Sequence, residues 1–434
     1  MERPYEEQIF ASGFAFMAQT VFLGKWFHRW LQPWRGIDWL LLLFPVAITL
    51  FSSLLIASTR LYTGKADLAW NHIVMCGVGV VLCMWIARSR YESLLEWRWV
   101  IYLITNVSLV AVMLIGTVGN GAQSWISIGN FNIQPSEFAK IGLIITLAAT
   151  LKDRESTTLG GLLKALAITA VPWILVFLQP DLGTSLVFGA IVLGMLYWSN
   201  MNPGWLVLLV SPIVAAIIFS FSIPVWIGWV ILAGVIAWMT LPLRWYSTLI
   251  IVVVNSIAGK IGELLWSLLQ DYQRDRLTLF LNPEQDPLGG GYHLIQSRIA
   301  IGSGQLWGRG LFHGTQTQLS FIPEQHTDFI FSALGEELGF MGALAMVLIF
   351  WFICLRLIII AQHAKDNFGS LLAIGVLSMI VFQVVVNIGM TIGLAPITGI
   401  PLPWMSYGRS SLLTNFIGIG IVESVANFHH RLKF

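Results

Sequence analysis

The chain has 434 residues, of which 56% are hydrophobic and 11% are charged, and its formal net charge at pH 7 is +2. This composition, with a mean hydropathy of +0.77, is typical of an integral membrane protein and excludes soluble globular and disordered chains. The near-neutral charge gives no indication of a nucleic-acid partner. The three cysteines lie in apolar stretches without metal-ligand spacing, so neither a disulfide scaffold nor a zinc site is supported.

Residues 1–36 begin with an acidic stretch and lack the basic start of a cleavable signal peptide. Their short apolar run is followed by tryptophans and basic residues, which anchor segments at membrane interfaces. We therefore expect an N-terminal cytoplasmic or interfacial segment, and a tail without a role is an equal alternative. Residues 37–434 are expected to form one transmembrane domain.

Apolar stretches of about 20 residues recur along the rest of the chain, and each is long enough to cross a bilayer as a helix. We expect an all-α polytopic membrane protein with about twelve transmembrane helices. The expected spans cover residues 38–58, 69–87, 98–117, 136–152, 162–178, 182–200, 204–222, 224–241, 246–270, 328–355, 371–393 and 410–428.

The basic residues of the short loops decide the expected orientation, because Lys and Arg are enriched on the cytoplasmic side of membrane proteins. Most of them fall on one side of the expected spans, including Arg88, Lys152, Arg244 and Arg356. This distribution predicts cytoplasmic termini and an extracytoplasmic position for the polar stretch 271–327.

The polar stretch 271–327 is too long to be a simple turn. Disorder fits poorly, because apolar residues such as Leu294, Trp307 and Phe312 recur among its glycines. We therefore expect an ordered, partly membrane-embedded loop that ends at a helix.

The first polar cluster at an expected outer helix end is the motif QPSEFAK (134–140). Glu137 and Lys140 are three residues apart and share a helix face, and Ser136 is an expected N-cap. An ionisable pair inside a membrane indicates function, because burying it is costly. A structural ion pair that closes the bundle is the alternative.

Two further clusters lie at outer turns. In QPDLGTS (179–185), Asp181 either has a functional role or caps the next helix. The stretch 401–411 is a rigid loop with hydroxyl groups, among them Ser406, and one arginine, and its simplest interpretation is an N-cap for the last span.

The fourth cluster ends at Asp328, which is expected to begin a helix, where a carboxylate is favoured by the helix dipole. At about 100° per residue, Ser332, Gly335, Gly339 and Gly342 fall on the same helix face as Asp328. Such a stripe of small residues allows close helix packing, and it could equally accept a lipid chain with its head group at Asp328.

These motifs resemble one known family. The run GYHLIQSRIAIGSGQLWGRGLFHGTQTQLSFIPEQHTDFIFSALGEELGF (291–340), with QPSEFAK, QPDLGTS and PLPWMSYG (401–408), is similar to the SEDS proteins of shape, elongation, division and sporulation. The similarity extends from about residue 38 to the C-terminus, and HGTQTQL (313–319) resembles the elongation members more than the division members.

The resemblance implies a peptidoglycan glycosyltransferase that polymerises lipid II at the outer face of the bacterial cytoplasmic membrane. Its implied partners are a class B penicillin-binding protein and elongation-complex membrane proteins such as MreC and MreD. The family's catalytic aspartate corresponds to Asp328, the expected general base of one inverting transfer from a lipid diphosphate. Cations, or a divalent ion such as Mg or Mn, would stabilise the leaving diphosphate. The candidate substrate-binding residues are Glu137, Lys140, Asp181, Arg274, Arg276, Arg298, Arg309, His326 and Ser406.

The chain departs from the family pattern in two ways. Family members usually have ten spans, whereas residues 200–270 hold three apolar segments where one is typical. The family's Ser-Tyr-Gly-Gly-Ser reads Ser406-Tyr407-Gly408-Arg409-Ser410, which puts the usual backbone conformation in doubt and could add a phosphate contact.

Two other classes of function stay open. A lipid II flippase or secondary carrier would use Glu137 and Lys140 in a proton or substrate pathway, but the polar clusters gather on one face and no internal repeat is evident. A scaffold that only activates its synthase leaves Asp328 above a lipid-sized groove unexplained.

Overall fold

The computed structural model describes residues 36–60, 67–119, 122–129, 131–153, 158–268, 274, 279–280, 282–287, 289, 291–319 and 321–428. The expected N-terminal interfacial segment therefore lies outside the described residues, except for Gly36.

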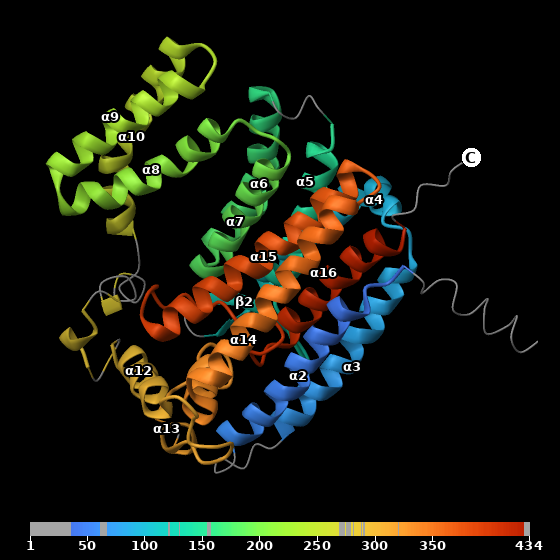
Figure 1. Cartoon of the computed structure of the whole chain (residues 1–434). Coiled ribbons are helices and arrows are strands. Elements are labelled where there is room, and N and C mark those ends of the chain that lie inside the picture. Colours follow the sequence, from blue (N-terminus) through green and yellow to red (C-terminus); the bar gives the residue numbers. More distant parts are fainter. Residues whose placement is uncertain are drawn as a thin grey trace, which may run out of the picture.

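The described chain is almost wholly helical (Figure 1), which confirms the all-α class apart from one small sheet. The long helices are α2 (Trp39–Thr59), α3 (Asp67–Arg88), α4 (Glu92–Ile115), α5 (Pro135–Leu151), α6 (Leu159–Leu178), α7 (Leu182–Trp198), α8 (Pro203–Phe221), α9 (Ile223–Thr240), α10 (Arg244–Leu268), α14 (Ile330–His363), α15 (Asn367–Ile392) and α16 (Arg409–Asn427). Shorter helices are η3 (Pro283–Gln285), α12 (Tyr292–Gly304) and α13 (Thr315–Gln318).

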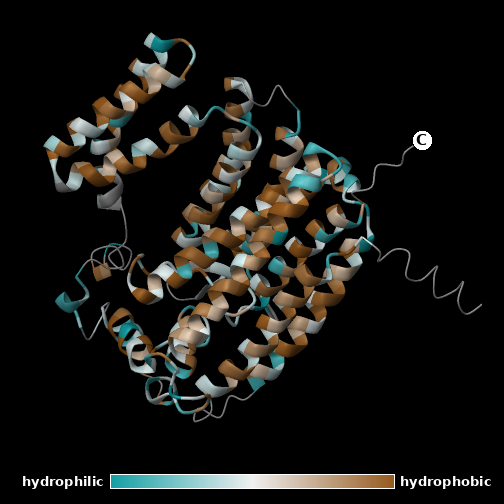
Figure 2. Ribbon diagram, viewed as in Figure 1, coloured by the Kyte–Doolittle hydropathy of each residue, from teal (hydrophilic) through white to brown (hydrophobic). Residues whose placement is uncertain are grey.

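Among the described residues, nine helices are long and apolar enough to cross a membrane. Helices also occupy the three other expected spans, but α5 and α7 have 17 residues each and α16 is more polar. Hydrophobic residues make up most of the long helices (Figure 2). The membrane class is therefore confirmed, while the number of twelve spans stays a prediction.

An antiparallel sheet between α4 and α5 was not expected from the sequence. Its strands, β1 (Thr117–Gly119), β2 (Ala122–Ile128) and β3 (Phe131–Ile133), pair in the order β1-β2-β3. The register pairs Ile126 with Ile133, and Gly129 has a φ of +61° between β2 and β3. A positive φ is accessible to glycine without steric cost, so this residue permits the tight return of the chain.

Helices α8, α9 and α10 stand apart from the main bundle (Figure 1). They contact one another, and α8 contacts α7. Their own apolar cluster consists of Leu208, Ala233, Ala237, Leu241 and Ile251. Within it the buried Asn255 donates a hydrogen bond of 3.0 Å to Ser211 Oγ, which ties α10 to α8. This unit coincides with the three apolar segments that depart from the family pattern.

Helix α14 is interrupted at Gly339, where φ is +66° and ψ is −163°. The interruption admits another segment of backbone: Phe340 N donates to Gln305 O at 2.8 Å, and Arg309 N donates to Glu336 O at 3.0 Å. The segment after α12 is therefore hydrogen-bonded to both sides of the break, which accounts for the backbone groups that the helix leaves unpaired.

Two buried carboxylates next to the break hold neighbouring loops. Glu336 accepts hydrogen bonds of 2.8 Å from the backbone N–H groups of Gln316 and Thr317. Glu337 accepts hydrogen bonds from Ser58 Oγ and from Phe312 N. Carboxylates of α14 thus bind the described part of the expected 271–327 loop.

The stripe of small residues on α14 is filled by protein. A Cβ on Gly335 would lie 3.1 Å from Ile301 Cγ1 of α12, and one on Gly339 would lie 2.3 Å from Gly308 N. Close packing, one of the two uses expected for the stripe, is therefore what the structure shows at these two glycines.

Gly339→Ala is expected to destabilise the protein, because alanine at this backbone conformation costs about 1–3 kcal/mol before the overlap with Gly308 is counted. The measurement is thermal unfolding in detergent, followed by tryptophan fluorescence. Gly302→Ala is the matched control: a Cβ there has no atom within 4 Å among the described residues, and helix α12 should gain stability. Equal melting temperatures for the two variants would contradict the role assigned to the break.

Candidate active site

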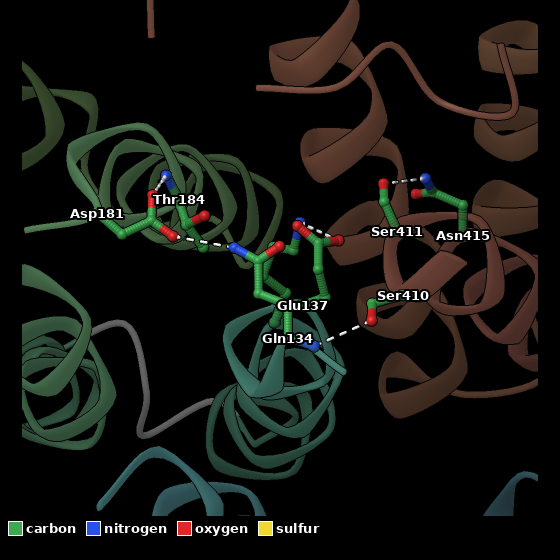
Figure 3. A network of polar contacts seen from close by, with 8 residues as sticks. Gln134, Glu137, Asp181, Thr184, Ser410, Ser411 and Asn415 are labelled. Carbon is green, nitrogen blue, oxygen red and sulfur yellow. Dashed lines mark hydrogen bonds and ion pairs between the residues drawn. The ribbon is translucent and has the colours of Figure 1, made fainter. Parts of the chain in front are cut away.

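Three of the four polar clusters expected at outer helix ends meet at one end of the bundle (Figure 3). Gln134 connects three helices: its backbone N donates to Ser410 Oγ at 3.0 Å, and its side-chain Nε2 donates to Asp181 Oδ2 at 3.2 Å. In the fourth cluster, Tyr407 N donates to His326 O at 2.9 Å. The sequence-based expectation that these motifs share one face is therefore confirmed.

Glu137 and Lys140 form the ion pair that their spacing predicted. Lys140 Nζ lies 2.8 Å from Glu137 Oε2, and their side chains are only 1% and 3% exposed. Helix α5 begins at Pro135 with Gln134 as its N-cap residue, so the expectation that Ser136 caps the helix is wrong. Proline at the first helical position explains the difference, because its fixed φ already suits a helix start.

Asp181 is the N-cap of α7, and its Oδ1 accepts a 3.0 Å hydrogen bond from Thr184 N. The capping interpretation is therefore confirmed. The second oxygen accepts from Gln134, so the same carboxylate also connects α7 to α5.

Asp328 does not begin α14, as the sequence analysis expected. The helix starts two residues later, at Ile330, and its N-cap residue is Phe329. The reason is a turn in which the backbone N–H groups of Thr327 and Phe329 both donate to Glu324 O, so the preceding residues follow a different path. Asp328 is partly exposed, and a Cβ on Gly399 would lie 3.6 Å from its Oδ2.

His326 is buried beside Asp328 and has two neighbours from distant parts of the chain. Arg60 Nη2 lies 2.9 Å from His326 Nδ1, and the rings of His326 and Tyr407 are 5.9 Å apart. The sequence analysis did not single out Arg60. Its partner lies 266 positions away, so no local pattern could have identified the contact.

Ser406 shapes the loop of residues 393–408, called the 393–408 loop below. Its Oγ accepts from Leu402 N at 2.8 Å, and its backbone N donates to Leu402 O at 3.0 Å. The N-cap residue of α16 is Gly408, and no described side chain caps this helix. The expectation that a hydroxyl of this loop caps the last span is therefore wrong. Arg409 is the first residue of α16 and needs no positive φ, so arginine fits this position without backbone strain.

The candidate arginines divide into two groups, and Arg276 lies outside the described residues. Arg298 Nη2 donates to Gly393 O at 3.2 Å and so reaches the 393–408 loop. Arg274 and Arg309 donate to nearby backbone carbonyls, those of Ser267 and Ser303. Arg298 therefore contacts the loop that also contains Ser406.

The sequence analysis did not single out three residues that organise this end. Gln134 and Ser410 hold α5 against α16, and Asn387 of α15 donates to the backbone of Asp328. A buried amide in a membrane helix is a usable signal for such residues, because an unpaired polar group there is costly. The sequence analysis selected its candidates mainly among ionisable side chains and so passed over these three residues.

Comparisons with known proteins agree with these motifs. The family model for FtsW, RodA and SpoVE, described as "Cell cycle protein", matches residues 36–228 and 222–431. The chain is 36% identical over 391 residues to the peptidoglycan glycosyltransferase MrdB of Escherichia coli K12, covering 90% of this chain and 93% of MrdB. It is also 36% identical to the peptidoglycan glycosyltransferase RodA of Treponema pallidum, covering 90% of this chain and 98% of RodA.

The fold agrees as well. A solved chain from a peptidoglycan synthase complex that coordinates polymerization and crosslinking is 26% identical, with a TM-score of 0.70. The match covers 92% of this chain and 100% of the solved one. With family motifs, sequence identity and fold in agreement, the chain belongs to the FtsW/RodA/SpoVE family of cell cycle proteins.

Proposed function

We propose that this protein is a peptidoglycan glycosyltransferase that polymerises lipid II during cell elongation. The observation that carries the proposal is the partly exposed Asp328 beside the 393–408 loop, at the end where the family motifs meet. The names of MrdB and RodA, both peptidoglycan glycosyltransferases at 36% identity, support the same activity.

In the proposed reaction, the 4-hydroxyl of an acceptor sugar attacks the anomeric carbon of the donor sugar. The Asp328 carboxylate takes the hydroxyl proton, the new glycosidic bond forms, and the bond to the lipid diphosphate breaks. One displacement converts the α-linkage of the donor into the β-linkage of the glycan. The diphosphate leaves without needing a proton, so a second carboxylic acid is not required, unlike in glycoside hydrolysis.

The leaving diphosphate requires positive charge or hydrogen-bond donors. Arg298 at the 393–408 loop and Arg409 at the start of α16 are the proposed contacts. The helices α5, α7 and α16 also begin at this end, and the positive ends of helix dipoles attract anions. Lys140 is bonded to Glu137, so its proposed role is to keep that carboxylate paired beneath the site.

A resident divalent ion has no ready-made site among the described residues. No group of three or more His, Cys, Asp or Glu side chains in that part of the chain could hold a metal ion. A divalent ion such as Mg or Mn therefore enters the proposal only as a companion of the substrate diphosphate, and no step depends on it.

The polymerase is favoured over a lipid II flippase because the polar motifs meet at one end of the bundle. At the opposite end, Arg356 Nε donates to Asp38 Oδ2 at 2.7 Å, and Asp38 N donates to Glu423 Oε2 at 2.9 Å. These three charged residues are thus joined to one another.

The proposal also covers the orientation of the protein in the membrane and its protein partners. The bias of basic residues supports cytoplasmic termini and an outer position for the Asp328 end. The similarity to a chain of a peptidoglycan synthase complex supports a cross-linking partner, proposed as a class B penicillin-binding protein. MreC and MreD are proposed as further partners from the family resemblance alone.

Asp328→Ala is expected to abolish polymerisation, because the acceptor hydroxyl loses its base. The assay combines purified protein, its penicillin-binding partner with transpeptidation blocked, and fluorescent lipid II, and separates the products on gels. Glu324→Gln, an exposed carboxylate of the same turn, serves as the control and should leave long glycan strands. Polymer from Asp328→Ala would remove Asp328 from its role, and transfer of lipid II across vesicles without polymer would favour the flippase.

Lys140→Met is expected to destabilise the protein by about 3–5 kcal/mol, because it leaves the Glu137 carboxylate buried without its partner. The double variant Glu137→Gln/Lys140→Met should regain most of the melting temperature, since no unpaired charge remains. If the pair also serves the substrate, the stable double variant will still polymerise poorly. Wild-type polymerisation by the double variant would reduce the pair to a structural role.

A further inference from the structure

Asn387 on α15 is fully buried and contacts the backbone of Asp328. Its amide nitrogen Nδ2 donates to Asp328 O at 2.9 Å and to Ile400 O at 2.8 Å. An asparagine amide carries two N–H donors, so both are used. The two carbonyls belong to segments 59 and 13 positions away along the chain. A single side chain therefore joins the turn that carries Asp328 to the 393–408 loop.

A second bond fixes the same turn two residues earlier. Tyr407 N, at the other end of the 393–408 loop, donates to His326 O at 2.9 Å. The backbone from His326 to Asp328 is thus held at both ends, and the carboxylate of Asp328 faces Gly399. Gly399 has a φ of +72°, a backbone conformation that favours glycine.

We propose that Asn387 is a positioning residue for the reaction, because its amide bridges Asp328 O and Ile400 O and so sets where the Asp328 carboxylate meets the acceptor hydroxyl. This inference rests on the proposed function, in which Asp328 is the base. A general base has to lie within hydrogen-bond reach of the proton that it takes. A displacement of about 1 Å can lower the rate of an enzymatic step by about 100-fold.

The same helix offers a matched control. Gln383 lies one turn earlier on α15 and is also fully buried, but neither its amide nitrogen nor its amide oxygen has a hydrogen-bond partner among the described residues. Replacing Gln383 with leucine removes a buried amide and breaks no described hydrogen bond. Replacing Asn387 with leucine removes an amide of the same kind and leaves two buried carbonyls without their donor.

The test compares four full-length variants with wild type in the lipid II polymerisation assay: Asn387→Leu, Asn387→Asp, Gln383→Leu and Asp328→Ala. Asn387→Asp keeps the side-chain shape but replaces the two N–H donors with an oxygen that, even when protonated, can donate to only one of the two carbonyls. Both Asn387 variants are expected to lose at least about tenfold in kcat with KM for lipid II changed less than about threefold. Gln383→Leu should stay within about twofold of wild type.

The split between kcat and KM separates positioning from a merely structural role. A folding defect would lower the amount of active enzyme, so melting temperature and active fraction are measured on each variant. If Asn387→Leu does not fold, Asn387→Asp carries the test alone. Wild-type kcat in a folded Asn387 variant would overturn the inference, as would an equal loss in Gln383→Leu.

The control with Asp328→Ala shows which proposal fails. If Asp328→Ala still polymerises lipid II, the assignment of the base fails and the Asn387 inference falls with it. If Asp328→Ala is inactive while folded Asn387→Asp and Asn387→Leu are fully active, only the Asn387 inference falls. If wild type makes no polymer, the proposed function itself is wrong.

Discussion

The hydrogen bonds of the 393–408 loop are the contacts on which this end of the molecule depends. Its carbonyls at Gly393, Ile400 and Trp404 accept from Arg298, Asn387 and Ser52, respectively. Together with the hydrogen bond from Tyr407 N to His326 O, these contacts join four parts of the chain, α2, α12, α15 and the turn before α14, to one short segment. Residues 400 and 402–406 of the loop are buried, where an unpaired backbone group is expensive, so hydrogen-bond partners there are a physical requirement.

The break in α14 also requires partners for buried backbone groups. An uninterrupted helix pairs its own backbone groups, but Gly339 opens this helix and exchanges those bonds with the segment after α12. The adjacent Glu336 and Glu337 are buried, and each is surrounded by donors from other segments. Buried carboxylates are tolerated when hydrogen bonds satisfy their oxygens, so these two order the loops around them.

Local sequence rules predicted the parts of this structure that depend on near neighbours. The positions of the long helices follow from apolar stretches, and the pair Glu137–Lys140 follows from a spacing of three residues on one helix. The gathering of the motifs at one end follows from counting spans. The first two features are each decided within a single helix.

The features that the sequence analysis missed, misplaced or left open depend on local turn geometry or on long-range contacts. The start of α14 was placed at Asp328, but a turn closed by Glu324 O delays it to Ile330. The roles of Arg60 and Asn387 depend on partners brought close only by the tertiary fold. The capping function of Asp181 was open from the sequence because a carboxylate before a helix suits both a cap and a binding site.

The unit of α8, α9 and α10 has a consequence for how such a membrane protein can change. Adding two membrane crossings returns the chain to the side from which it departed, so everything downstream keeps its sidedness. Because these helices have their own apolar cluster and an internal Asn255–Ser211 bond, most of their stabilising contacts are with each other. The lateral outline of the protein in the bilayer can therefore grow while the residues around Asp328 keep their neighbours.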